Sequence, residues 1–131
     1  MSALFGALVL AVFWRSADKG PASMLLRFHD GVRRQDANAI ENTVVTGPGH
    51  RSIEVLIRQT SIAVGRRAKV EIAGIDILKS EARAAVIYKI GKETPIATVW
   101  VLDREEKGWK VNAYKTVSLM EQLIERSGRR I

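Results

Sequence analysis

Residues 70–114 read VEIAGIDILKSEARAAVIYKIGKETPIATVWVLDREEKGWKVNAY, and much of this stretch alternates apolar and polar side chains with a period of about two. Turn-forming residues divide it into four predicted strands, at 70–77, 82–90, 96–103 and 109–114. The pair Ala73-Gly74 shifts the alternation of the first strand as a β-bulge would. The third strand is apolar on both faces, so we expect it to be central. Consecutive strands with short connections predict an antiparallel sheet.

Helical periodicity dominates the residues before these strands. We expect helices at 21–34, 37–44 and 53–65, and a last amphipathic helix at 117–127. Pro21 is favoured in a first helical turn, Asp36 is a good N-cap, and Gly65 suits a helix C-terminus. The composition of residues 46–49, Thr-Gly-Pro-Gly, predicts a loop between the second and third helices.

Helices grouped before a run of hairpins predict an α+β domain. Its N-terminal helices should pack on one face of a curved antiparallel sheet of about four strands. We assign this domain to residues 20–131, preceded by an apolar helix at residues 1–19. We also expect Trp100 and Trp109 to be buried in the strands, with Trp109 closing the last hairpin against a helix.

The N-terminal segment from Ala3 to Trp14 carries no charge and is followed by Arg15 and Lys19. As a helix it would span about 18 Å, against roughly 30 Å of bilayer hydrocarbon. Its length suits a signal peptide, but a basic start and a small-residue cleavage site are missing. An uncleaved membrane anchor, a helix packed on a partner, a poor signal peptide and a core helix all remain open. For the anchor or partner helix, the expected contact residues are Leu4, Phe5, Leu8, Leu10, Phe13 and Trp14.

The net charge of +7 over 131 residues invites a nucleic-acid interpretation. The basic pairs are spread along the chain, however, and only 6% of the residues are aromatic. A phosphate-tracking groove needs clustered cations and usually aromatic rings for the bases, so the pattern argues against nucleic acid. Anionic lipid headgroups suit the same charge. The absence of cysteine excludes disulfides and thiolate chemistry.

Two segments carry a resemblance to a known family. They are Arg33-Arg34-Gln35-Asp36-Ala37, where one helix ends and the next begins, and the late strand pair VWVLDREEKGWKVNAYK. Over Pro21–Thr116 the chain resembles the nuclear transport factor 2-like superfamily, which implies the cone-shaped fold shared with cystatin-like proteins. That superfamily hosts isomerases, dehydratases, polyketide cyclases, transport receptors and secretion-system scaffolds, so the resemblance selects no single function. Several membrane-associated members have a similar layout, with a membrane-proximal helix before a cone domain used for assembly.

The resemblance also directs attention to acids, histidines and tyrosines at the mouth of the cone. The candidates in this chain are His29, Asp30, His50, Asp76, Tyr88 and Tyr114. If the protein is an enzyme, His29 would be the base, Asp76 the orienting acid and Tyr88 the oxyanion donor. The competing interpretations are structural. His29 would be a hydrogen-bonded histidine at the boundary of the core, Asp76 a solvated aspartate and Tyr88 a tyrosine at a sheet edge. We expect the three not to converge, and the cone to be filled by Leu, Ile and Val.

No other motif in the sequence supplies chemistry. Two distant histidines do not make a metal site, and Gly47-Pro48-Gly49 lacks a phosphate-cradling pattern, so no metal or cofactor is expected. The missing catalytic set and the apolar segment favour a non-catalytic, membrane-associated scaffold or accessory subunit. Its partners would be proteins of a larger complex or further copies of the chain, with membrane lipids at the N-terminal segment. The alternative is a small apolar-ligand binder or an isomerase or cyclase that uses the cone pocket.

Overall fold

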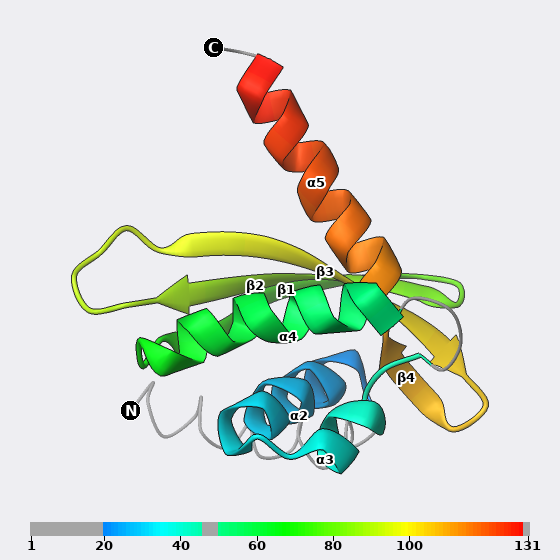
Figure 1. Ribbon diagram of the computed structural model, residues 1–131. Helices are drawn as coiled ribbons and strands as arrows, with labels where there is room; N and C mark the ends of the chain where they lie inside the picture. The colour runs from blue at the N-terminus through cyan, green and yellow to red at the C-terminus, as the bar shows by residue number, and fades with distance from the viewer. Residues whose placement is uncertain (1–19, 46–49, 130–131) are drawn as a thin grey trace, which may run out of the picture.

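Helices precede the strands, and one long helix follows them (Figure 1). The computed structural model describes residues 20–45 and 50–129, so the predicted apolar helix at 1–19 and the loop at 46–49 lie outside the described residues. The described elements are α2 (Pro21–Arg34), α3 (Ala37–Glu41), α4 (His50–Gly65), β1 (Lys69–Leu78), β2 (Glu81–Lys89), β3 (Ile96–Glu105), β4 (Gly108–Val111) and α5 (Ala113–Arg129). Pro21 lies in the first turn of α2, and the Asp36 carboxylate caps α3 by accepting from the Ala39 amide at 3.1 Å.

The four strands form one curved antiparallel sheet in the order β1-β2-β3-β4 (Figure 1). The predicted α+β class is therefore correct, and β3 is an inner strand as its apolar sequence indicates. The pairing of β1 with β2 shifts register between Ile72 and Gly74, which confirms the predicted bulge. This sheet provides the surface on which the helices pack.

Large aromatic side chains fill the centre of the domain. Trp100 and Phe28 are the largest fully buried side chains, so the expectation of a cone filled by Leu, Ile and Val is wrong in part. The register explains the difference, because Trp100 on β3 pairs with the small Ala84 on β2. Small residues on one strand leave room for a large ring on the next. Leu25, Leu56 and Leu102 complete the packing.

Both tryptophan predictions for the strands are confirmed. Trp100 is 1% exposed and Trp109 is 5% exposed. Trp109 lies on β4, which packs against α2, and the Arg104 guanidinium lies 5.2 Å from the centre of its ring. A cation over a tryptophan face is a favourable contact that shields the ring from water.

The end of the sheet differs from the sequence-based expectation. The fourth strand was predicted to reach residue 114 and the last helix to begin at 117, but β4 ends at Val111 and α5 begins at Ala113. The reason is Asn112, whose side-chain oxygen accepts from the Lys115 amide at 2.9 Å. This is the geometry of an N-cap, and it ends the strand and starts the helix at one residue.

Two helix ends also differ from the prediction. The second helix was expected to include Val44, but α3 ends at Glu41 and Val44 forms an isolated parallel bridge with Val111. Helix α4 begins at His50, three residues before the predicted start, but it ends at Gly65 as predicted. The left-handed residue of its C-terminal cap is Arg67, with a φ of 59°. The Ala68 amide donates to the Ala63 carbonyl and the Arg67 amide to the Val64 carbonyl, both at 3.0 Å. These two hydrogen bonds form a Schellman motif, which places the left-handed residue two positions after Gly65.

Candidate functional site

A buried histidine–tyrosine pair joins α2 to the sheet at the centre of the domain. His29 Nδ1 lies 2.7 Å from the Leu25 carbonyl, and His29 Nε2 lies 2.6 Å from the Tyr88 hydroxyl. A carbonyl can only accept, so Nδ1 carries the proton and Nε2 of the neutral ring accepts from Tyr88. Both side chains are buried, and both ring nitrogens of His29 and the Tyr88 hydroxyl have hydrogen-bond partners inside the core.

Burial and hydrogen bonding fix the protonation state of this pair and leave neither ring nitrogen of His29 free. Burial lowers the pKa of His29, with the Leu25 carbonyl opposing the shift, so the ring stays neutral. Burial raises the pKa of Tyr88, and the nearby polar groups of Thr60, Thr98 and Trp100 oppose this only in part. The free lone pair of the imidazole is already occupied by the Tyr88 hydroxyl. The pair therefore behaves as a structural tie between helix and sheet.

Trp100 extends this tie into a wider buried cluster. Its ring lies 4.9 Å from the His29 ring and 5.4 Å from the Phe28 ring, measured between centroids. The Trp100 Nε1–H donates to the Thr98 hydroxyl at 3.0 Å, and that hydroxyl donates to the Val86 carbonyl at 2.9 Å. Helix α2 and strands β2 and β3 are thus connected through one set of rings and hydrogen bonds.

The remaining sequence candidates do not join this cluster. Asp76 is exposed on β1, the strand at the edge of the sheet, where its register partner is Arg83. Asp30 pairs with Arg33 and Arg34, His50 lies 3.3 Å from Glu54, and Tyr114 is 63% exposed. The structure therefore brings together His29 and Tyr88 but places Asp76 elsewhere. Tyr88 lies on an inner strand, so the edge-tyrosine interpretation is wrong.

A cavity of about 220 Å³ lies beside Tyr88, between α4, the strands β2 and β3, and Met120 of α5. Its surface is mostly apolar, although six of its twelve lining residues carry a polar side-chain group, namely Gln59, Thr60, Arg66, Tyr88, Thr98 and Trp100. The Thr60 hydroxyl is near Tyr88. In the described part of the chain, however, no group lies in a suitable geometry to form a hydrogen bond with it. A buried hydroxyl without a hydrogen-bond partner destabilises the fold. Thr60 lines the cavity, so a bound molecule there could supply the missing partner. Thr60 is four residues from both Leu56 and Val64, so the sequence pattern alone assigns it to an apolar helix face and does not indicate this role.

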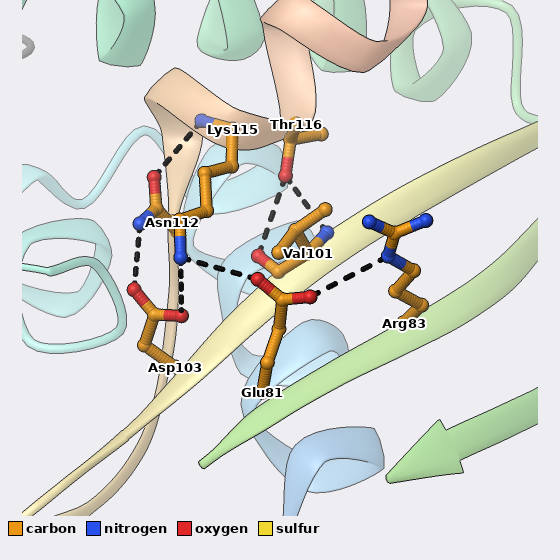
Figure 2. A network of polar contacts seen from close by, with 7 residues as sticks. All are labelled: Glu81, Arg83, Val101, Asp103, Asn112, Lys115 and Thr116. Carbon is orange, nitrogen blue, oxygen red and sulfur yellow. Dashed lines mark hydrogen bonds and ion pairs between the residues drawn. The ribbon is translucent and has the colours of Figure 1, made fainter. Parts of the chain in front are cut away.

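A polar network fastens the first turns of α5 to the sheet (Figure 2). The Thr116 hydroxyl accepts from the Val101 amide at 2.9 Å and lies 3.3 Å from the Val101 carbonyl. The Thr116 hydroxyl thereby provides hydrogen-bond partners for the Val101 backbone on β3, next to the point where β4 ends. The Lys115 ammonium bridges Glu81 and Asp103 at 3.1 and 3.3 Å, and Asn112 donates to Asp103 at 2.6 Å.

Beyond this network, α5 extends away from the rest of the domain (Figure 1). Met120 packs against the core, whereas Leu123 is 44% exposed and Ile124 is 70% exposed. Residues three and four apart lie on one helix face, so these two side chains continue the face that Met120 begins. An apolar helix face of this kind is normally covered by another surface. We call Leu123 and Ile124 the α5 apolar face.

Helices packed on a curved four-stranded antiparallel sheet are consistent with a nuclear transport factor 2-like (NTF2-like) fold. The chain is similar in structure to a solved protein from Campylobacter jejuni described as an NTF2-like transpeptidase. The two share 12% sequence identity at a TM-score of 0.53, over 71% of this chain and 97% of that chain. Similarity at this identity establishes the fold alone, which confirms the resemblance found in the sequence. No protein-family model and no curated protein matches the chain.

Two further searches concern the described residues only. Within residues 20–45 and 50–129, no group of three or more His, Asp or Glu side chains is arranged to hold a metal ion. In the same ranges, every helix is too short or too polar to cross a bilayer. The candidate contact residues Leu4, Phe5, Leu8, Leu10, Phe13 and Trp14 lie outside these ranges.

Proposed function

We propose that this protein is a non-catalytic scaffold or accessory subunit that binds a protein partner through the α5 apolar face. The observation that carries the proposal is the exposure of Leu123 and Ile124 on a helix that leaves the body of the domain. The helix is held firmly at its base by Thr116 and Lys115, so its free half is a preformed surface and needs little ordering on binding.

The chemistry of the core supports a non-catalytic role. The lone pair of the candidate base His29 is already hydrogen-bonded to Tyr88, and the candidate acid Asp76 is exposed on another strand. We also propose that the charge-free segment at residues 3–14 holds the domain at a membrane, beside its partner. The partner would then be a membrane-associated protein with an apolar surface, or a second copy of the chain.

Assembly is expected to depend on the α5 apolar face. The full-length chain is purified in mild detergent, and its mass is measured by size-exclusion chromatography with light scattering. The wild type should form a complex of defined stoichiometry, and the double variant Leu123→Asp/Ile124→Asp should release the monomer with an unchanged melting temperature. The control Glu121→Gln/Glu125→Gln alters exposed polar residues of the same helix and should keep the complex. A complex that survives the aspartates contradicts the proposal, and a monomeric wild type excludes a second copy of the chain as the partner.

A second candidate function is the binding of a small apolar ligand in the cavity beside Tyr88. The unpartnered Thr60 hydroxyl favours it, because a mostly apolar cavity with a few convergent polar groups is the usual form of a ligand site. Thr60 could donate to a carbonyl oxygen while the apolar lining covers the rest of the molecule. Trp100 and Thr98, which also line the cavity, are hydrogen-bonded to each other. Of these three groups, the Thr60 hydroxyl is therefore the most available to a ligand.

Thr60→Val is expected to raise the free energy of unfolding of the ligand-free protein by about 1 kcal/mol, because it removes a buried unsatisfied hydroxyl at nearly constant volume. Urea denaturation measures this. The matched control is Thr43→Val, which removes a buried hydroxyl that donates to the Ile40 carbonyl at 2.8 Å, and which should destabilise by a similar amount. The small ketone cyclohexanone should shift the NMR signals of the cavity residues in the wild type, and more weakly in Thr60→Val. Equal shifts in both proteins, or none in either, would exclude this second function.

A further inference from the structure

A second and larger cavity, of about 520 Å³, lies between α2 and the turn that joins α4 to β1. Its apolar lining comes from Leu26, Val64, Ala68 and Val70, and its polar lining from His29, Asp30, Arg33 and Arg67. The assembly surface on α5 and the cavity beside Tyr88 do not use these residues, apart from the structural pairing of His29 with Tyr88. An apolar wall beside charged groups is suited to a molecule with an apolar body and a charged head.

Arg67, which lines this cavity, has a strained backbone conformation. Its φ of 59° is in the left-handed region, where glycine is the usual residue at a helix C-terminus. Any residue with a Cβ is strained in that conformation. The two hydrogen bonds of the Schellman cap hold the residue there, and its side chain lines the cavity. Gln35 and Lys79 also have positive φ angles, but neither lines this cavity.

The charges around the cavity leave one cation uncompensated. Asp30 binds both Arg33 and Arg34, and Arg34 also lies 4.0 Å from Asp36, so two cations meet two carboxylates. Arg67 forms no ion pair with any residue that the structure describes. His29 adds no charge because burial lowers its pKa. The cavity therefore offers a single free positive charge beside its apolar wall.

We propose that this cavity binds a small monoanionic amphiphile, with a carboxylate head at Arg67 and an apolar chain against Leu26, Val64 and Val70. A single uncompensated guanidinium matches one carboxylate, which it can engage with two parallel hydrogen bonds. The Asp30 carboxylate is held by its two arginines on the α2 side, so the anionic head lies toward Arg67. None of the residues that line this site belongs to the α5 apolar face.

The test is a calorimetric titration of the full-length chain with octanoate, and with 1-octanol and acetate as probes of the chain and the head alone. Octanoate should bind, and octanol and acetate should each bind at least tenfold more weakly. Arg67→Gly should weaken octanoate binding about tenfold, because it removes the cation while glycine adopts the same backbone angle without strain. The matched control is Lys79→Gly, which removes a cation from a positive-φ turn position outside the cavity and should leave the affinity unchanged.

Each outcome of this titration decides the proposal. Octanol binding as tightly as octanoate would show that the head is not recognised, and acetate binding as tightly would show that the chain is not. Unchanged affinity in Arg67→Gly, or an equal loss in Lys79→Gly, would overturn the role of Arg67. Circular dichroism of both variants shows that the fold is retained, and we expect Arg67→Gly to be at least as stable as the wild type.

Discussion

Replacing Trp100 with alanine is expected to lower the free energy of unfolding by about 3–5 kcal/mol. Trp100 is fully buried, its ring contacts Phe28 and His29, and its Nε1–H is bonded to Thr98. The facing residue on β2 is Ala84, which is too small to fill the space that the ring leaves. A loss of this size is a large part of the 5–15 kcal/mol that is typical of a whole domain.

Urea denaturation followed by far-ultraviolet circular dichroism measures this loss without relying on tryptophan fluorescence. Tyr114→Ala is the control, because Tyr114 is an aromatic residue that is 63% exposed and should change stability by no more than about 0.5 kcal/mol. If Trp100→Ala proves as mild as the control, the ring does not hold the helices to the sheet and the description of the core is wrong.

Removing the Tyr88 hydroxyl with Tyr88→Phe is expected to cost about 1–3 kcal/mol. The ring volume is almost unchanged, but His29 Nε2 loses its donor at 2.6 Å and is left buried without a partner. The raised pKa of Tyr88 keeps the hydroxyl protonated, so it acts as a donor throughout the neutral range. The loss should therefore be the same at pH 7 and pH 8.

A double-mutant cycle with His29→Leu separates the pair from its surroundings, because a hydrogen bond between the two side chains predicts that the second substitution costs less once the first is made. Equilibrium unfolding of the four proteins gives the coupling energy. Tyr114→Phe serves as the matched loss of an exposed hydroxyl. Strict additivity of Tyr88→Phe and His29→Leu would falsify the proposed tie between α2 and β2.

The α5 apolar face and the proposed carboxylate cavity at Arg67 follow from different properties of the same fold. The α5 apolar face exists because α5 leaves the sheet at an angle, so its far half extends beyond the body of the domain (Figure 1). The carboxylate cavity exists because α4 ends in a cap that requires a left-handed residue, and this chain has Arg67 at that position. Neither surface uses the buried His29–Tyr88 tie as a reactive group, so substitutions in the core test stability and those at the surfaces test binding.

Much of the architecture was predictable because it depends on local patterns. The period of two in residues 70–114 and the turn residues between the runs predicted the strands and their antiparallel order. Pro21, Asp36 and the Ala73-Gly74 bulge are short-range signals whose meaning does not depend on distant residues. The start of α5 was missed because Asn112 could continue an alternating strand or cap a helix, and the alternation through Ala113 favoured the strand.

The candidate site depended on contacts between residues far apart in the chain. His29 and Tyr88 are 59 positions apart, and no local pattern indicates that their side chains meet. Asp76 was expected to be solvated from its place between two isoleucines, but only the sheet order shows that it lies on the edge strand. The unpartnered Thr60, the free charge of Arg67 and the exposure of Leu123 and Ile124 are likewise properties of surroundings. The burial and hydrogen bonding of a residue depend on which residues pack against it, and these neighbours are determined only by the tertiary packing of the helices on the sheet.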